Sequence, residues 1–456
     1  MTLWTAAEIA AATGGTASVD FAVTGVTFDS REVQPGDLFI AMKGEASDGH
    51  RYLDQAMARG AAGLIVSEPT DHPHVRVADG FAALNALGVA ARTRLQGTVI
   101  GVTGSVGKTG TKEALFAALD RTAPGAVHRS VKSYNNHTGV PLSLSRASAA
   151  SRFGVFEMGM NHAGEITALT RMVRPHVAVI TAIAPAHIEF FKDESGIADA
   201  KGEIFQGLEP GGTAIVPFDS VHRDRLIGHA RPHAGRIVTF GIGEGADVRA
   251  LDVVRTLTGG SEVTAKVGDR QLTYRIGLPG AHWVSNSLAV LAAVEAAGGD
   301  LALAGLALAD MADLPGRGAR VGITVGGGHA LLIDESYNAN AASMRATLAV
   351  LAAEPATRRA VVLGEMRELG DQSAALHAAL ADPVVAADVR FAVLVGEGMA
   401  PLAKALEGRV EMVHVPDAAA ATAAIGPWLA PGDAVLVKGS NGVRLATLVA
   451  ALAGKN

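Results

Sequence analysis

The chain has 456 residues, too many for one ordinary domain, and this length predicts two to four domains. Apolar residues make up 49% of the sequence, enough for several cores and unlike a disordered chain. The 39 basic and 45 acidic residues give a net charge of −6 without long basic runs, which argues against a nucleic-acid-binding surface. The lack of cysteine excludes disulfides, thiolate metal ligands and thiol nucleophiles.

The first fifteen residues, MTLWTAAEIAAATGG, do not resemble a signal peptide, because no basic stretch precedes an apolar core. Elsewhere, Gly, Asp, Glu and Arg interrupt the Ala-rich stretches before they reach the length of a membrane span. We therefore expect a soluble, cytoplasmic protein with no membrane insertion.

Two breaks divide the chain into three blocks. The first block ends after an Ala-rich helical stretch near residue 95, and Pro315 and Gly316 mark the second break. Short β-branched runs alternate with Ala/Leu-rich stretches of helical period, which is typical of the α/β class. The sequence predicts domains at 1–95, 96–312 and 313–456.

The third block contains four apolar runs, HALLID, RAVVLG, FAVLVG and DAVLVKG, each followed by a helical stretch. Four strand–helix alternations in such a short block predict a doubly wound, Rossmann-like domain.

The second block begins with VIGVTGSVGKTGTKEAL, which resembles a phosphate-binding loop of unusual spacing. The common template G-x-x-x-x-G-K-[ST] requires glycine where this chain has Val102. A β-branched run precedes the loop and helical spacing follows it, so backbone N–H groups and the helix dipole would face an anion. We predict an ATP-binding loop in which Lys108 contacts the β- and γ-phosphates and the Thr109 hydroxyl binds Mg²⁺. The loop consists of Gly104, Ser105, Val106, Gly107, Lys108 and Thr109. The alternative is a glycine-rich turn with a surface Lys and Thr, which the strand–helix context disfavours.

A metal-bound nucleotide needs further ligands, such as carboxylate or neutral imidazole groups. Glu157 ends the apolar run FGVFE, and a second run, beginning HVAVIT, ends near His187. The ends of parallel strands meet at one sheet edge, so both side chains are candidate metal ligands. Taken singly, each residue also fits an ordinary structural or solvated position.

The motifs that follow the loop resemble those of the Mur ligase family, in the same order. They are TGSVGKT, SYNNHTGVP, FEMGMNHAGEI, APAHIEFF, ADAKGEIF, LPGAHWVSNSLAVLAA and IDESYNANAASM. The resemblance covers nearly the whole chain, from FDSREVQPGD to VLVKGSNGVRL. It explains the loop, because the phosphate loop of this family has the short form G-x-x-G-K-T.

The resemblance implies a three-domain enzyme with a central P-loop ATPase domain that forms an amide bond at the expense of ATP, through an acyl phosphate. It implies ATP and Mg²⁺ as cofactors, and UDP-N-acetylmuramoyl-tripeptide and D-alanyl-D-alanine as substrates in peptidoglycan synthesis. Thr109 and Glu157 would bind one Mg²⁺, and His187 would help to bind a second. Lys201 matches the family lysine that carries a carbamate, although without the resemblance it would read as a solvated helix lysine.

Further residues come from the same resemblance. Asn286 matches the adenine-contacting asparagine, although Trp283 stands where the family commonly has Asn. Arg320 has the spacing of the arginine that reaches ATP phosphates from the C-terminal domain, and Asn136, with Asn135, matches a pair near the nucleotide. The UDP end of the substrate is expected at Ser30, Arg31, Lys43, Gly44, Asp48, Gly49 and His50. Glycines there permit close backbone approach, and Arg, Lys and His suit a diphosphate.

Two alternatives stay open. The first is the Mur ligase that adds the third residue, diaminopimelate or lysine, although its Asp-Asn-Pro-Arg signature does not occur here. The second is a P-loop regulatory module without ligase activity, although no guanine-reading Asn-Lys-x-Asp occurs and three blocks exceed what a switch needs. We expect a monomer.

Overall fold

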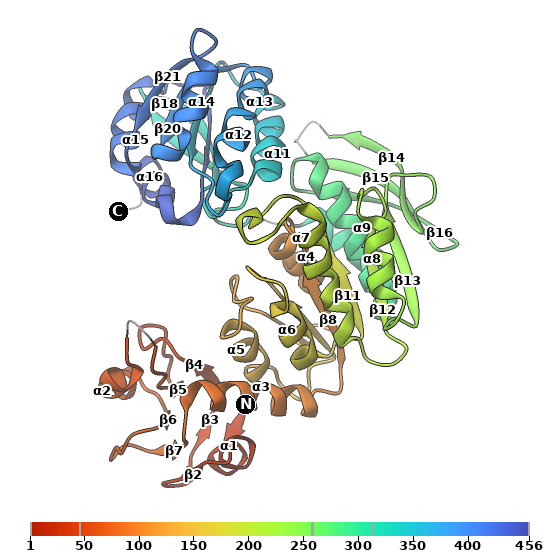
Figure 1. The fold of residues 1–456 in the computed structure, drawn as a ribbon, viewed down its shortest axis with the longest axis vertical. Helices are drawn as coiled ribbons and strands as arrows, with labels where there is room; N and C mark the ends of the chain where they lie inside the picture. The colour runs from red at the N-terminus through yellow and green to blue at the C-terminus, as the bar shows by residue number, and fades with distance from the viewer. Residues whose placement is uncertain (1, 45–46, 257–259, 312, 455–456) are drawn as a thin grey trace.

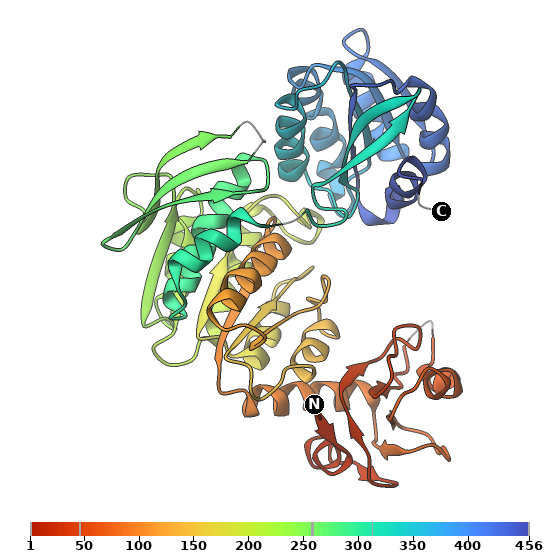
Figure 2. The same cartoon turned by 180° about the vertical axis from the view of Figure 1, so that it is seen from behind.

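The computed structural model describes residues 2–44, 47–256, 260–311 and 313–454. The N-terminal and C-terminal parts of the chain lie at opposite ends of a larger central part (Figure 1, Figure 2). Each part has a sheet with helices against it, so the predicted α/β class is confirmed. No helix within these described ranges is long and apolar enough to cross a bilayer.

The N-terminal part is built on a five-stranded sheet of order β2-β7-β6-β5-β4, in which β2 runs antiparallel to β7 and the other pairings are parallel. Strands β1 and β3 form a separate antiparallel pair. The elements are β1 (Trp4–Thr5), α1 (Ala6–Thr13), β2 (Thr16–Ala17), β3 (Ala22–Val23), β4 (Gly25–Thr27), β5 (Asp37–Ile40), the 3₁₀ helix η1 (Gly49–Tyr52), α2 (Leu53–Ala58), β6 (Gly63–Val66), β7 (His74–Arg76) and α3 (Gly80–Arg94).

Helix α3 joins the first two parts of the chain. Asp79 caps its N-terminus by accepting a hydrogen bond from Ala82 N. Its buried face, which includes Leu84 and Leu87, belongs to an apolar cluster that also contains Leu142 of the central part. The first two parts therefore share a core at this helix.

The central part contains a nine-stranded sheet of order β16-β15-β14-β13-β12-β11-β8-β10-β9. Its elements are β8 (Thr98–Thr103), α4 (Lys108–Thr122), β9 (Val127–Arg129), α5 (Gly139–Ser145), β10 (Phe153–Glu157), α6 (Glu165–Val173), β11 (Val177–Ile180), η2 (Ile188–Phe190), α7 (Glu194–Gly202), η3 (Glu203–Gly207), β12 (Thr213–Pro217), α8 (Arg223–Ala230), β13 (Arg236–Gly241), β14 (Val248–Arg255), β15 (Ser261–Val267), β16 (Arg270–Ile276), α9 (Ala281–Ala296) and α10 (Leu301–Ala309).

This sheet is parallel from β9 to β14, as predicted, but β14, β15 and β16 pair antiparallel. Strand β15 alternates buried and more exposed residues, which is typical of an antiparallel strand with one face on the core. Val267 pairs with Arg270, so a two-residue turn containing Gly268, at φ 59°, closes the hairpin.

The C-terminal part has a six-stranded sheet of order β17-β18-β22-β19-β20-β21, parallel except for the β17–β18 hairpin. The four predicted strands are confirmed as β18, β19, β20 and β22, whereas β17 and β21 were not predicted. The elements are β17 (Ala319–Val325), β18 (Gly328–Glu335), α11 (Ala341–Ala352), β19 (Arg359–Gly364), η4 (Gly370–Gln372), α12 (Ser373–Ala378), α13 (Ala381–Ala386), β20 (Val389–Val395), η5 (Glu397–Met399), α14 (Ala400–Leu406), β21 (Glu411–Val415), α15 (Ala418–Ile425), η6 (Gly426–Trp428), β22 (Ala434–Lys438), η7 (Asn441–Val443) and α16 (Leu445–Leu452).

The predicted boundary at residue 95 falls just after α3, and the predicted boundary at residue 312 lies outside the described residues. The ranges 1–95, 96–312 and 313–456 stay predictions.

Candidate active site

The loop between β8 and α4 has a backbone that requires its glycines. Gly104 has φ 151°, and a Cβ there would lie 2.0 Å from the Thr181 hydroxyl oxygen. Gly107 has φ 85°, and a Cβ there would lie 2.8 Å from Asn286 Oδ1. Helix α4 begins directly afterwards, at Lys108. The loop thus presents a helix N-terminus at the carboxyl end of a central parallel strand, as a phosphate-binding loop does.

Side chains of the loop fix its position and supply its charge. The Ser105 hydroxyl donates to Ala184 O (2.8 Å) and accepts from Ala184 N (3.0 Å), which ties the loop to the segment after β11. Lys108 Nζ donates to Gly104 O at 2.6 Å. Burial lowers the pKa of the Lys108 ammonium, while the charge of Glu157 opposes that shift.

Glu157 is the last residue of β10 and only 1% of it is exposed. Its Oε2 accepts a hydrogen bond from the Thr109 hydroxyl at 2.9 Å, and its Oε1 accepts one from Asn135 Nδ2 at 2.7 Å. Lys112 Nζ lies 4.0 Å from Oε2. A buried carboxylate beside a hydroxyl is a donor set of hard oxygens, so these residues fit Mg²⁺.

His187 does not end a strand, contrary to the prediction. Strand β11 stops at Ile180, and the next residue, Thr181, donates from its hydroxyl to Val106 O of the phosphate loop at 2.6 Å. His187 lies in the loop that follows, just before η2. Its Nδ1 lies against the carboxylate of Glu368 in the C-terminal part.

Lys201 lies in the last turn of α7 and is fully buried, which rules out the solvated helix lysine. Burial, together with the cation of Lys108, holds the pKa of Lys201 well below its usual range. Within the described residues, no carboxylate pairs with this amine. A neutral amine is nucleophilic, which is the state that carbamate formation needs.

Arg320 does not reach the phosphate loop. Both terminal nitrogens of its guanidinium donate to Glu354, at 2.6 and 2.5 Å, and Glu354 is 2% exposed. Arg317 instead crosses to the central part, where its Nη2 donates to Ser133 Oγ at 3.0 Å. Its guanidinium carbon lies 4.2 Å from the ring centroid of Tyr337, which holds the side chain in place.

Asn135 and Asn136 differ in what they contact. Asn135 binds Glu157, whereas Asn136 Oδ1 accepts from Thr138 N, the Thr138 hydroxyl and Gly139 N, at the start of α5. Asn136 Oδ1 therefore has a structural role at the start of α5, and its contact with the nucleotide stays a prediction.

A cavity of about 510 Å³ joins these groups between the central and C-terminal parts. From the central part it is lined by Ser105, Val106, Gly107, Lys108, Thr109, Gly110, Ser133, Asn135, Glu157, His187, Trp283 and Asn286, and from the C-terminal part by Arg317, Glu335, Tyr337, Asn338, Asn340 and Lys438, among others. Lys438 Nζ, 2% exposed, donates to Asn338 O at 2.9 Å and lies 3.2 Å from Glu335 Oε2. Gly104, Asn136, Lys201 and Arg320 are absent from this lining.

The predicted UDP-binding residues lie in the N-terminal part, away from this cavity, and several are paired with neighbours. Arg31 pairs with Asp29 (2.7 Å) and is 81% exposed, Lys43 pairs with Glu68 (2.6 Å), and the buried Ser30 donates to Gln55 (2.8 Å). Gly44 N donates to Ser47 O, and Gly49 opens η1.

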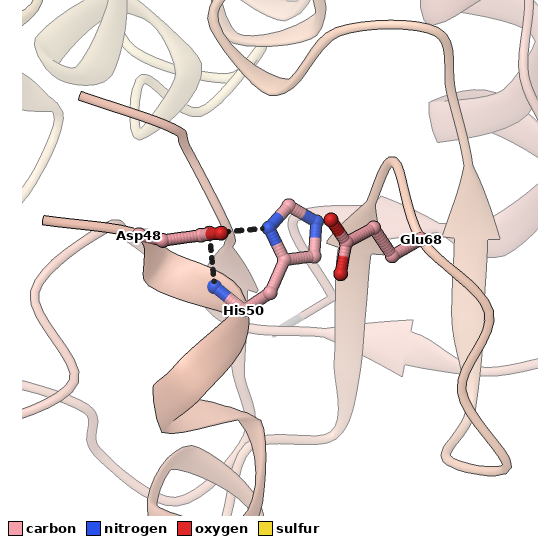
Figure 3. A group of neighbouring side chains, drawn as sticks. All are labelled: Asp48, His50 and Glu68. Atoms are coloured by element: carbon pink, nitrogen blue, oxygen red, sulfur yellow. Dashed lines mark hydrogen bonds and ion pairs between the residues drawn. The ribbon is translucent and has the colours of Figure 1, made fainter. Parts of the chain in front are cut away.

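Asp48, His50 and Glu68 come close enough to suggest a metal site, but their atoms are already engaged (Figure 3). His50 Nδ1 lies 2.7 Å from Asp48 Oδ1, and His50 Nε2 accepts from Ser67 N at 3.0 Å. Glu68 is the partner of Lys43. Both nitrogens of the ring are used to fix the loop, so we assign no metal here.

Sequence reasoning missed Arg317, Tyr337 and Lys438 as site residues. The Pro and Gly of the stretch LPGRGAR indicate a domain boundary, and by themselves they do not indicate a site residue. An arginine beside a hinge-like turn was the available signal for Arg317.

Comparison with known proteins supports one family over the whole chain. Residues 102–294 match the family described as Mur ligase middle domain, residues 316–441 match Mur ligase, glutamate ligase domain, and residues 22–91 match Mur ligase family, catalytic domain. A UDP-N-acetylmuramoyl-tripeptide--D-alanyl-D-alanine ligase of Synechocystis is 34% identical over 450 residues, covering 96% of this chain and 94% of that protein. The ligase of the same name from Escherichia coli is 35% identical over 388 residues, covering 83% and 82% of the two chains.

Solved structures agree with the sequence matches. MurF from Acinetobacter baumannii is 33% identical, with a TM-score of 0.84 and 99% of both chains covered. MurF ligase from Thermotoga maritima in complex with ADP is 26% identical, with a TM-score of 0.76, covering 95% of this chain and 98% of that one. The phosphate loop, the buried carboxylate and the arginine that crosses from the C-terminal part thus occur in a chain that belongs to the Mur ligase family.

Proposed function

We propose that this protein joins D-alanyl-D-alanine to UDP-N-acetylmuramoyl-tripeptide, with cleavage of ATP to ADP and phosphate, in peptidoglycan precursor synthesis. The observation that carries the proposal is the cavity between the central and C-terminal parts, where a phosphate loop, a buried carboxylate and two cations of the other domain meet. The relatives that bear this activity in their names match nearly the full length of the chain.

The reaction requires two anions to meet. The substrate carboxylate attacks the γ-phosphorus of ATP, and the bond between the γ-phosphorus and the bridging oxygen of the β-phosphate breaks. The products of this step are ADP and an acyl phosphate. The amine of D-alanyl-D-alanine then attacks the acyl carbon, phosphate leaves, and the amine gives up a proton. Phosphorylation is needed because a free carboxylate is a poor electrophile.

The residues that line the cavity can be assigned to the parts of the substrates that these steps involve. Lys108 and the N–H groups of the loop bind the phosphates of ATP, and Arg317, in place of Arg320, contacts them from the C-terminal domain. Asn286, beside Gly107, and Trp283 contact the nucleoside. Lys438 and Asn338 line the cavity from the C-terminal part, and we assign them to the D-alanyl-D-alanine substrate.

Bound Mg²⁺ would neutralise part of the negative charge of the phosphates and would polarise the γ-phosphoryl group. Thr109 and Glu157 would hold one ion, and His187 with a carbamate on Lys201 would hold a second. In this assignment Asn135 orients the Glu157 carboxylate by donating to its Oε1.

The UDP end is assigned to the N-terminal domain, at Ser30, Arg31, Lys43, Gly44, Asp48, Gly49 and His50. Arg31 and Lys43 supply the charge for a diphosphate, and Asp48 and His50 hold the loop that carries Lys43. We further propose that the enzyme acts as a monomer in the cytoplasm, with domains at 1–95, 96–312 and 313–456.

The test is phosphate release measured with each substrate omitted in turn. We expect release that requires Mg²⁺, UDP-N-acetylmuramoyl-tripeptide and D-alanyl-D-alanine together. Release with a UDP-muramoyl-dipeptide and free diaminopimelate or lysine would instead identify the ligase that adds the third residue. Hydrolysis of ATP that ignores both substrates would indicate a regulatory ATPase.

A further inference from the structure

Two loops from different domains meet beside the cavity. One is the loop of the central domain that holds His187 and leads into η2, and the other follows β19 in the C-terminal domain and leads into η4. Glu189 N donates to Glu368 O at 3.4 Å, and the Nδ1 of His187 lies against the Glu368 carboxylate. Glu368 thus holds the facing loop through both its backbone and its side chain.

The backbone of both residues is strained at this meeting point. His187 has φ 60° and Glu368 has φ 62°, the left-handed region that costs a non-glycine residue roughly 1 kcal/mol or more. Such conformations persist where the surroundings impose them. Here the neighbouring Ile188 and Leu369, each 3% exposed, belong to one buried apolar cluster that extends through both domains. The pairing is therefore built into the packing of the two loops.

The ring of His187 has one nitrogen left for another partner. Nδ1 lies against the Glu368 carboxylate and the ring lines the cavity, so Nε2 is the nitrogen left to bind a cation. A histidine that binds a metal through one nitrogen commonly donates the other N–H to a carboxylate, which fixes its tautomer and ring orientation. The arrangement here has that form, with the carboxylate supplied by another domain.

We propose that Glu368 is a positioning residue that orients His187 toward a divalent cation, so that docking of the C-terminal domain completes a metal site of the central domain. The inference rests on the metal role given to His187 under the proposed function. It assigns to the C-terminal domain a part in metal binding in addition to its contacts with the substrates.

The test measures Mn²⁺ binding to the full-length protein, saturated with a non-hydrolysable ATP analogue, by electron paramagnetic resonance. Nitrogen modulation of the Mn²⁺ signal reports an imidazole ligand, and titration gives the affinity. For Glu368→Gln we expect an affinity lower by roughly tenfold and weaker nitrogen modulation. Glu368→Asp, which keeps the charge on a shorter side chain, should fall between Glu368→Gln and the wild type.

Two variants serve as references. Asp371→Asn changes an exposed carboxylate three residues further on, which makes no ion pair within the described chain, and should leave Mn²⁺ binding unchanged. His187→Ala should remove the nitrogen modulation, and adding Glu368→Gln to it should have no further effect.

The outcomes separate the two proposals. Normal Mn²⁺ binding by Glu368→Gln, with loss in His187→Ala, would overturn the positioning role and leave the metal role of His187 intact. Tighter binding by Glu368→Gln would overturn it too, since Glu368 would then hold His187 away from the cation. Unchanged nitrogen modulation in His187→Ala would refute the metal assignment of the proposed function itself.

Discussion

At the scale of single residues, the site depends on charges that the fold removes from water. Lys201 is fully buried, and burial lowers its pKa, which favours the neutral amine that the proposed reaction with CO₂ needs. A carbamate there would turn a group that repels a cation into an oxygen ligand. Lys108 differs, because its role with the phosphates requires the positive charge.

This difference predicts opposite responses to a small carboxylate. Lys201→Ala should lower turnover on the order of a hundredfold, and acetate should restore part of it by placing an oxygen ligand in the vacated space. Acetate should not restore Lys108→Ala. Phosphate release against acetate concentration measures both. Full activity of Lys201→Ala without acetate would refute the carbamate.

Substitution of Arg317 should affect catalysis, whereas substitution of Arg320 should affect the stability of the fold. Arg317→Ala removes a cation from the cavity, so we expect kcat to fall by about 10²-fold or more with an unchanged unfolding midpoint. Arg320→Ala leaves the buried Glu354 without its partner, and we expect a loss of about 3 kcal/mol in the free energy of unfolding. Turnover and urea titrations of the two variants check this. If Arg320→Ala lost kcat while remaining fully folded, the contact with the ATP phosphates first predicted for Arg320 would be supported instead.

At the scale of elements, much of the fold follows from the sequence. Apolar runs in the sequence predict strands β8, β10 and β19, because a parallel strand that is buried on both faces consists of consecutive apolar residues. Strand β11 ends earlier than predicted, because the Ala-rich residues after Ile180 look apolar in sequence. The contact of Thr181 with Val106 of the loop is a tertiary feature that no local pattern reports. The pairing of Arg320 with Glu354 and of His187 with Glu368 depends on loops distant in sequence, which no local pattern reports.

Strand β9 is attached to α5 by a histidine that should make stability sensitive to acid. His128 Nε2 lies 2.7 Å from Ser143 O, and burial lowers the pKa of His128 from 6.5 to about 4. The unfolded chain therefore binds a proton that the folded chain excludes, so the stability from this group is present above pH 6.5 and is lost as the pH falls toward 4. Between pH 7 and pH 5 the loss is about 2 kcal/mol.

Urea unfolding at the two pH values tests this. His128→Asn should lose much less stability between pH 7 and pH 5 than the wild type, whereas His233→Asn, at an exposed position, should respond like the wild type. An equal acid response in His128→Asn and the wild type would contradict the assignment.

At the scale of the whole molecule, the proposed site is divided among domains that bind different ends of the substrates. The phosphate loop lies in the central part and the residues proposed to bind UDP lie in the N-terminal part (Figure 1). Helix α3 and Leu142 of the central part belong to one shared apolar cluster. Changes at one end should therefore leave binding at the other end intact. Lys108→Ala should abolish turnover while the affinity for UDP-N-acetylmuramoyl-tripeptide, measured by calorimetry, stays near that of the wild type.

Arg31→Ala should show the reverse pattern. Arg31 is exposed and would contact the diphosphate, so its loss should weaken the affinity for the UDP substrate about tenfold, while the affinity for ADP stays unchanged. In turnover the effect should appear in KM for the UDP substrate rather than in kcat, because the residue lies outside the cavity where the bonds change. If Lys108→Ala also lost the UDP substrate, or Arg31→Ala also lost ADP, the two ends would not be bound by separate domains, and the division of the site proposed here would be wrong.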